Sequence, residues 1–227
     1  IKNNGRLQTL LNYEWQVWKM LRSNRIILTD VDGVLLEWEN HFTQWMLNRH
    51  YFTDTGDKIY PYKLLPDKQN TYEMAERFGL SISEIRKEIR EFNKSAWMGT
   101  QLPMPDSQTW VKLLHAEGWT LIPITSQTSD IPAQLLRKKR LGELFGDHVF
   151  QNYHILDTGA DKNSALSEFH GTGLYWVEDK PKNALCGLEY GLKPIIVDHP
   201  YNRDFSHPDI TRVNNWKDIH DITQNKR

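Results

Sequence analysis

The segment RIILTDVDGVLL, residues 25–36, decides the fold of this chain. Its apolar, β-branched first half is typical of a buried strand, and the run Asp30-Val31-Asp32-Gly33 that follows is typical of a tight turn. The pattern therefore predicts a buried strand that delivers two carboxylates to its carboxyl end. A buried strand needs neighbours on both sides, and the rest of the sequence must provide them.

The sequence after residue 105 alternates short apolar runs with helical patterns. A helix capped by Asp106 or Ser107 comes first and runs through His115. Strands are then predicted at residues 119–124, 148–155, 174–177 and 194–197, and helices at residues 131–144, 164–169 and 183–190. Such alternation is typical of the α/β class, in which a parallel, Rossmann-like sheet is flanked by helices.

Residues 37–104 interrupt this alternation and form a predominantly helical insert. Helical patterns lie at residues 42–50, 71–78 and 81–92, and a polar, Pro-containing stretch at residues 54–70 predicts a loop. Ser81 and Glu84 form a capping-box pattern that marks the start of the third helix. We therefore expect a small helical cap at 37–104, inserted after the first strand of an α/β core made of residues 25–36 and 105–227.

Residues 1–24 carry an amphipathic pattern of their own. Apolar residues recur at three- and four-residue steps: Leu7, Leu10, Leu11, Trp15, Trp18 and Leu21. This spacing predicts an N-terminal helix with one apolar face. That face needs a cover, which either the rest of the domain or the second subunit of a homodimer would provide.

Composition excludes several classes of function. The 227 residues suit one domain or slightly more. The net charge of −1 argues against binding to polymeric nucleic acid, because such domains are usually strongly basic. The single cysteine, Cys186, cannot form an internal disulfide, which favours a reducing compartment and hence a cytoplasmic protein. No apolar run approaches 18 residues, so no membrane span is predicted.

Chemically active side chains follow several of the predicted strands. Active sites of parallel sheets lie at the carboxyl ends of the strands, so these side chains are expected on one rim. They are Asp30, Asp32, Thr125, Ser126, Glu178 and Asp179, and Lys162 lies shortly before the strand that ends in Glu178. Clustered carboxylates need a compensating cation, and oxygen ligands favour Mg²⁺. Hydroxyls and an ammonium suit a phosphoryl group, so the set predicts metal-assisted phosphoryl transfer.

The same residues resemble the four motifs of the haloacid dehalogenase superfamily. Residues 30–35 match its D-x-D-G-V-L signature, residues 124–126 resemble its second motif, Lys162 its third and the pair Glu178-Asp179 its fourth. A narrower resemblance points to the 5′(3′)-deoxyribonucleotidase family. It rests on residues 97–98, 102–105, 198–203 and 212–216, and on a small helical cap inserted after the first motif.

The resemblance implies the catalytic and metal-binding roles. Asp30 would be the nucleophile that forms an aspartyl-phosphate, and Asp32 would be the general acid and then the base. Mg²⁺ would be held by the side chains of Asp30 and Asp179 and by the backbone carbonyl of Asp32. Glu178 would support the metal from outside its ligand shell, through water.

The resemblance also implies the substrate contacts. Thr125 or Ser126 would donate hydrogen bonds to the phosphoryl oxygens, and Lys162 would neutralise charge on the nucleophile and the phosphate. Trp38 would line the base pocket of a nucleoside monophosphate. A tryptophan that only packs the cap core is the alternative for Trp38.

Two other functions remain open. The same chemistry could act on another small phosphate ester, such as a sugar phosphate. The chain could also be a non-catalytic binding module that retains the fold, although the complete motif set disfavours it. The basic run at residues 137–140 is expected to be a solvated helix face.

Overall fold

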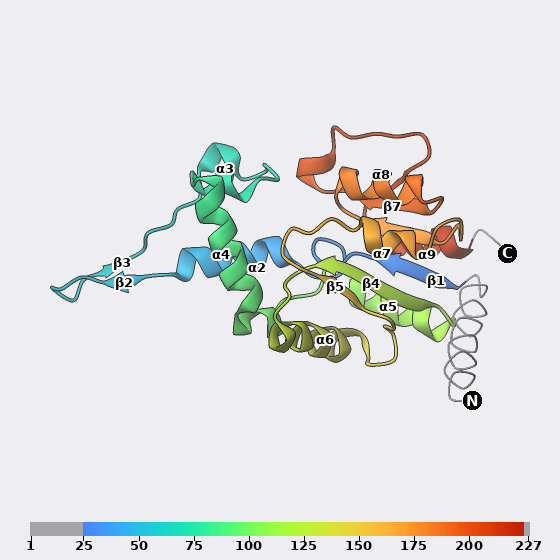
Figure 1. Ribbon diagram of the computed structural model, residues 1–227, viewed down its shortest axis with the longest axis horizontal. Coiled ribbons are helices and arrows are strands. Elements are labelled where there is room, and N and C mark those ends of the chain that lie inside the picture. The colour runs from blue at the N-terminus through green and yellow to red at the C-terminus, as the bar shows by residue number, and fades with distance from the viewer. Residues whose placement is uncertain (1–24, 225–227) are drawn as a thin grey trace, which may run out of the picture.

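The computed structural model describes residues 25–224, which form a twisted sheet flanked by helices with a helical cap beside it (Figure 1). The sheet is parallel throughout and has the strand order β5-β4-β1-β6-β7-β8. Its strands are β1 (Ile26–Thr29), β4 (Thr120–Ser126), β5 (His154–Leu156), β6 (Tyr175–Glu178), β7 (Lys193–Val197) and β8 (Thr211–Val213). The α/β class is confirmed. The helix expected at residues 1–24 lies outside the described residues.

Two apolar clusters cover the two faces of the sheet. One joins the sheet to α5 (Ser107–Ala116), α6 (Ile131–Phe145) and α9 (Trp216–Gln224), and the other joins it to α7 (Asn163–Ser167) and α8 (Pro181–Glu189). Ile27 belongs to the first cluster and Ile26 and Leu28 to the second, because successive side chains of a strand point to opposite faces. This burial on both faces explains why β1 is entirely apolar up to Thr29.

The cap has an apolar cluster of its own, built around the ring of Phe42 and the rings of Phe78 and Phe92, which both meet it edge-on. Its elements are α2 (Trp38–Asn48), β2 (Tyr51–Phe52), β3 (Lys58–Ile59), η1 (Pro66–Lys68), α3 (Met74–Phe78), α4 (Ile82–Lys94) and η2 (Ala96–Gly99). The capping box of Ser81 and Glu84 is confirmed at the start of α4. The expected loop at residues 54–70 contains β3 and η1, and β2 and β3 form a hairpin that projects from the cap (Figure 1).

Three local expectations were wrong. The strand expected at residues 148–155 is only β5, because Asn152 has a φ of 49° that interrupts an extended chain. The strand β8 was not expected, since two of its three residues are exposed and leave no apolar run. Asp106 does not cap α5 through its side chain; its carboxylate accepts the backbone N–H groups of Trp216 and Lys217 at 3.2 and 3.0 Å and caps α9 instead.

Across residues 25–224, no helix combines the length and the apolar character that crossing a membrane requires.

Candidate active site

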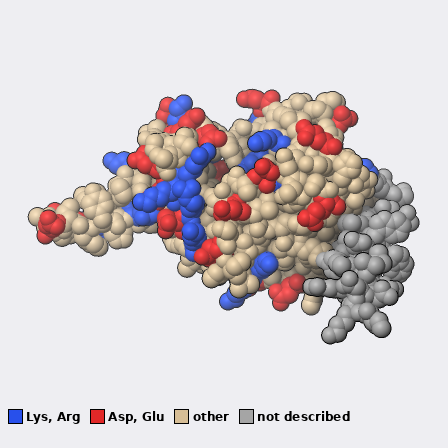
Figure 2. Space-filling view, in the orientation of Figure 1, with Lys and Arg blue, Asp and Glu red and all other residues tan. Residues whose placement is uncertain are grey.

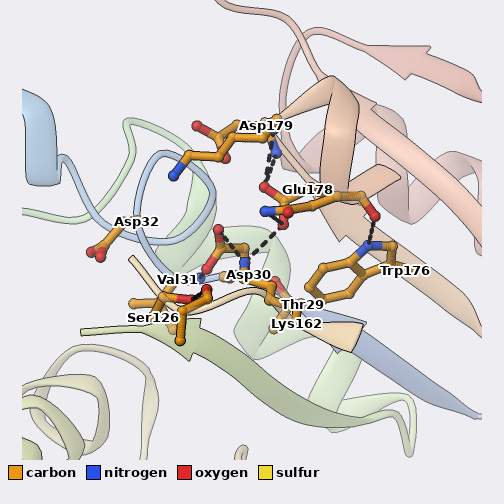
Figure 3. A network of polar contacts seen from close by, with 12 residues as sticks. Thr29, Asp30, Val31, Asp32, Ser126, Lys162, Trp176, Glu178 and Asp179 are labelled. Atoms are coloured by element: carbon orange, nitrogen blue, oxygen red, sulfur yellow. Dashed lines mark hydrogen bonds and ion pairs between the residues drawn. The ribbon is translucent and has the colours of Figure 1, made fainter. Parts of the chain in front are cut away.

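The strand order brings the predicted site residues to one edge of the sheet. β1 lies between β4 and β6, and it pairs with both in parallel. The residues at the carboxyl ends of these three strands therefore meet at one edge of the sheet, as Figure 3 shows for Asp30, Ser126 and Glu178. The backbone N–H of Asp30 still donates to the Val177 carbonyl at 2.8 Å, which fixes the start of the turn against β6.

A buried lysine joins two of these carboxylates. The Lys162 Nζ lies 2.6 Å from an Asp30 carboxylate oxygen and 2.8 Å from a Glu178 carboxylate oxygen. All three side chains are almost fully buried. Burial by itself would lower the pKa of Lys162, but the charges of Asp30 and Glu178 outweigh it and raise that pKa. Lys162 is therefore a permanent cation beside Asp30.

Asp30, Glu178 and Asp179 form a compact acidic group. One carboxylate oxygen from each lies within 4.8 Å of the others. Burial, followed by the charge of Glu178, raises the pKa of Asp30 to about 6. Burial likewise raises the pKa values of Glu178 and Asp179. The group is costly to keep ionised without a further cation.

Glu178 is buried, and its carboxylate accepts several hydrogen bonds from the loop that follows β6. Besides the ion pair with Lys162, its carboxylate accepts the backbone N–H groups of Asp179 and Lys180 at 3.1 and 3.0 Å and the Asn183 side-chain amide at 3.2 Å. These bonds hold the loop, and with it Asp179, at the rim of the sheet.

Asp179 is held on one side and open on the other. The hydroxyl of Tyr201 donates to Oδ2 of Asp179, and the Asn202 side-chain amide donates to its backbone carbonyl at 2.8 Å. Oδ1 is buried and has no hydrogen-bond partner among the described residues. Sequence reasoning missed Tyr201, although it lies in the segment 198–203 that carries the narrower resemblance.

Gly33 makes room for this arrangement. Its φ is +75°, a conformation that L side chains rarely adopt, and a Cβ there would lie 2.6 Å from Oδ2 of Asp179. A glycine at the end of the Asp30–Gly33 turn thus serves both the turn and the approach of Asp179.

The acidic group suits a divalent cation. Mg²⁺ prefers oxygen ligands and is usually held by one or two carboxylates with water and phosphate. The open, buried oxygen of Asp179 and the neighbouring oxygens of Asp30 and Glu178 offer that donor set. The raised pKa values of these carboxylates also favour a cation site, because a bound cation would lower those values and stabilise the ionised carboxylates.

Asp32 lies apart from this group. Figure 3 shows its side chain pointing away from Asp30 and Asp179. Its carboxylate receives hydrogen bonds from Nη1 and Nη2 of Arg137 at 2.7 and 3.3 Å. Burial raises the pKa of Asp32, and the charge of Arg137 opposes that rise. The expectation that residues 137–140 form a solvated face was wrong for Arg137, which is 0% exposed.

The two hydroxyls after β4 differ in their surroundings. Oγ1 of Thr125 is buried and has no hydrogen-bond partner within the described chain. Oγ of Ser126 donates to the Ala160 carbonyl at 2.8 Å, and Ser126 lines the cleft described next. Their predicted role as phosphate ligands stays a prediction.

A cleft of about 1030 Å³ opens between the cap and this edge of the sheet. Asp32, Ser126 and Asp179 line it from the core, and Trp38 lines it from the cap. Trp38 is half-buried, stacks on Phe42 with ring centroids 5.0 Å apart, and donates from Nε1 to Asn93 at 2.9 Å. These contacts belong to the cap core, yet they leave Trp38 on the cleft wall.

No protein-family model matches this chain, and no curated protein sequence matches it either. Solved structures do match, 95 chains in all. A hydrolase of the haloacid dehalogenase-like family from Streptococcus pneumoniae has a TM-score of 0.58 at 15% identity, over 88% of this chain and 98% of that one. The D,D-heptose 1,7-bisphosphate phosphatase from B. bronchiseptica, in complex with magnesium and phosphate, has a TM-score of 0.54 at 12% identity, over 89% and 99%.

A third structure, CbbY from Rhodobacter sphaeroides in complex with phosphate, has a TM-score of 0.53 at 17% identity, over 86% of this chain and 96% of that one. At such low identities these similarities establish the fold: the chain has the haloacid dehalogenase-like fold. The wider resemblance expected from the four motifs is supported at this level. The narrower resemblance to 5′(3′)-deoxyribonucleotidases stays a prediction.

Proposed function

We propose that this protein is a Mg²⁺-dependent phosphomonoesterase that works through an aspartyl-phosphate on Asp30. The observation that carries the proposal is the buried Lys162–Asp30 ion pair beside the acidic group of Asp30, Glu178 and Asp179. The similar fold of a phosphatase solved with magnesium and phosphate supports it.

In the proposed reaction, a carboxylate oxygen of Asp30 attacks phosphorus and the bond from phosphorus to the ester oxygen breaks. Asp32 donates a proton to that leaving oxygen. Asp32 then takes a proton from water, which attacks phosphorus and releases phosphate with Asp30 restored. Lys162 balances the charge that builds on Asp30 and on the phosphoryl oxygens.

Asp30 and Asp179 would hold the Mg²⁺ with their side chains and Asp32 with its backbone carbonyl, while Glu178 holds the loop beside them. When bound, the ion neutralises phosphate charge and orients the phosphoryl group. Tyr201 keeps Asp179 turned so that its second oxygen stays open.

The first substrate candidate is a nucleoside monophosphate. Its base would rest on Trp38, which lies on the cap wall of the cleft. The second candidate is a sugar phosphate, because the structural neighbours include a phosphatase of heptose bisphosphate. The cleft volume of about 1030 Å³ admits either ligand.

The decisive experiment is a panel of nucleoside monophosphates and sugar phosphates assayed for phosphate release with and without Mg²⁺. We expect Mg²⁺-dependent release, abolished in Asp30→Asn because an amide does not attack phosphorus. Asp32→Asn should be slower by roughly 10²–10⁴, the usual effect of general acid–base catalysis. Release of phosphate by Asp30→Asn at the wild-type rate would disprove the mechanism, and no release from any ester would favour the non-catalytic module.

A further inference from the structure

Two arginines of the cap line the same cleft as Asp32 and Asp179. Arg86 and Arg90 are four residues apart on α4, so they lie on one face of the helix about 6 Å apart along its axis. Both side chains are exposed. The cleft thus has a cationic pair on its cap wall, while Asp179 of the acidic group lines it from the core.

These two guanidiniums have no partners within residues 25–224, where they form no ion pair or hydrogen bond. By contrast, the cap arginines Arg49 and Arg77 pair with Glu88 and Glu39. Like charges four residues apart also destabilise a helix. The pair therefore brings no stabilising contact to the cap, which points to an anionic ligand.

The carboxylates of the cleft do not neutralise the pair. Asp32 is bound to Arg137, Asp179 accepts from Tyr201 and Glu39 is paired with Arg77. Glu73, at the start of α3, and Asp161, just before α7, also line the cleft, but within the described chain neither forms an ion pair with Arg86 or Arg90.

The cationic surface is visible from outside. Figure 2 shows Lys and Arg side chains gathered along the cap where α4 runs. The exposed basic residues of that helix are Arg86, Lys87, Arg90 and Lys94. Only Arg86 and Arg90 among them line the cleft, and Lys180 and Lys182 line it from the core.

We propose that Arg86 and Arg90 form a second phosphate subsite, so that the substrate is a phosphate ester that carries a second phosphate group. The inference rests on the proposed function, which places the scissile phosphate at Asp30. Arginine suits this role because its planar guanidinium binds phosphate through two parallel hydrogen bonds. The cleft is large enough for an ester with a phosphate at each end.

The test compares esters that differ only in the second phosphate. Fructose 6-phosphate is matched with fructose 1,6-bisphosphate, and adenosine 5′-monophosphate with adenosine 3′,5′-bisphosphate. We expect a higher kcat/KM for the bisphosphate of at least one pair. Arg86→Ala and Arg90→Ala should each lower the ratio of the two kcat/KM values about 5- to 30-fold, because each removes a charged hydrogen-bond donor.

Lys87→Ala is the matched control. Lys87 is exposed on the same helix but does not line the cleft, so its loss should leave the ratio unchanged. A ratio that Arg86→Ala and Arg90→Ala leave unchanged would overturn the subsite. An equal fall in Lys87→Ala would overturn it too, because it would show only a general attraction of anions to a basic helix.

A binding measurement separates this inference from the proposed reaction. Asp30→Asn should bind the preferred bisphosphate in calorimetry, and adding Arg86→Ala or Arg90→Ala should weaken that binding about 5- to 30-fold. Arginine-dependent binding without any turnover by the wild type would support the subsite and refute the phosphatase. Turnover by the wild type, together with binding that neither arginine substitution weakens, would support the phosphatase and refute the subsite.

Discussion

The guanidinium of Arg137 contacts both carboxylate oxygens of Asp32, at 2.7 and 3.3 Å, across 105 residues of sequence. Arg137 is fully buried on α6, whereas 22% of the Asp32 side chain is exposed. The pair fixes the carboxylate of Asp32 on the wall of the cleft, and its side chain points away from Asp30 (Figure 3). Arg137 is therefore a positioning residue for the proposed general acid.

Replacing Arg137 should change the pH dependence of the reaction. In Arg137→Met the pKa of Asp32 should rise, because the cation that favours its ionised form is lost. A general acid must be protonated, so the alkaline decline of kcat should move to higher pH, and kcat at its optimum should fall by about 10-fold or more. The measurement is kcat between pH 5 and 9. Lys139→Met, on the same helix and 73% exposed, is the control and should keep the wild-type profile. An unchanged profile in Arg137→Met would show that the pair does not tune Asp32.

The raised pKa of Asp30 predicts a pH-dependent cost in stability. Its pKa is about 6 in the folded protein and 3.8 in the reference state, so the folded state holds the proton more tightly between these values. The contribution of Asp30 to stability should therefore fall as pH rises from about 3 to about 7, by about 3 kcal/mol in total at 1.36 kcal/mol per unit of pKa shift.

This cost is measured by comparison with Asp30→Asn, which does not titrate. Under metal-free conditions, urea unfolding should show the variant gaining about 3 kcal/mol on the wild type between about pH 3 and pH 7, most of it between pH 4 and pH 6, with no further gain above pH 7. Added Mg²⁺ should reduce the difference, because a cation favours the ionised carboxylate. A difference that stays constant from pH 4 to pH 7 would contradict the prediction.

Removal of metal should stop turnover. We expect chelation to abolish phosphate release, Mg²⁺ to restore it and Ca²⁺ to fail, because Ca²⁺ prefers more ligands and a looser geometry. Mg²⁺ at about 100 times its Kd should also stabilise the folded protein by about 2.7 kcal/mol, which is measured as an increase in Tm. In Asp179→Asn, Mg²⁺ should produce only a small part of this increase in Tm. Full activity in excess chelator would assign the acidic group to another purpose.

Gly33 should not tolerate a side chain. Gly33→Ala places a Cβ 2.6 Å from Oδ2 of Asp179 at a φ of +75°, so we expect Mg²⁺ affinity and kcat/KM to fall about 10- to 100-fold. Gly56→Ala is the matched control. Its φ is +84° but nothing lies within 4 Å of the added Cβ, so it carries the backbone strain without the collision. If Gly33→Ala and Gly56→Ala lower kcat/KM by the same factor, the collision with Asp179 is not the cause of the loss.

Trp38 tests the choice of substrate. Trp38→Ala should lower kcat/KM for a nucleoside monophosphate roughly 5- to 150-fold if a base stacks on the ring, and Trp38→Phe should keep most of the activity. Hydrolysis of a sugar phosphate is the control and should change little. An equal loss for both substrates would mean that Trp38 only packs against Phe42 and the rest of the cap core.

Several features could be predicted from sequence because they depend on neighbours along the chain. The apolar run before Asp30 is typical of a buried strand and forms β1, and the helix expected at residues 131–144 is α6 within one residue. The capping box of Ser81 and Glu84 is equally local, since its hydrogen bonds span three residues. The spacing of strands and helices was enough to predict a parallel α/β sheet.

The tertiary structure alone decided which charges are paired. In the sequence Arg137 is one of four consecutive cations and looks solvated, but α6 turns it into the core against Asp32. Arg86 and Arg90 look like members of an ordinary charged helix, yet the position of the cap leaves them unpaired on the cleft wall. Ion pairs and buried contacts join residues far apart in sequence, so they depend on strand order and on where the cap lies, which no local pattern encodes.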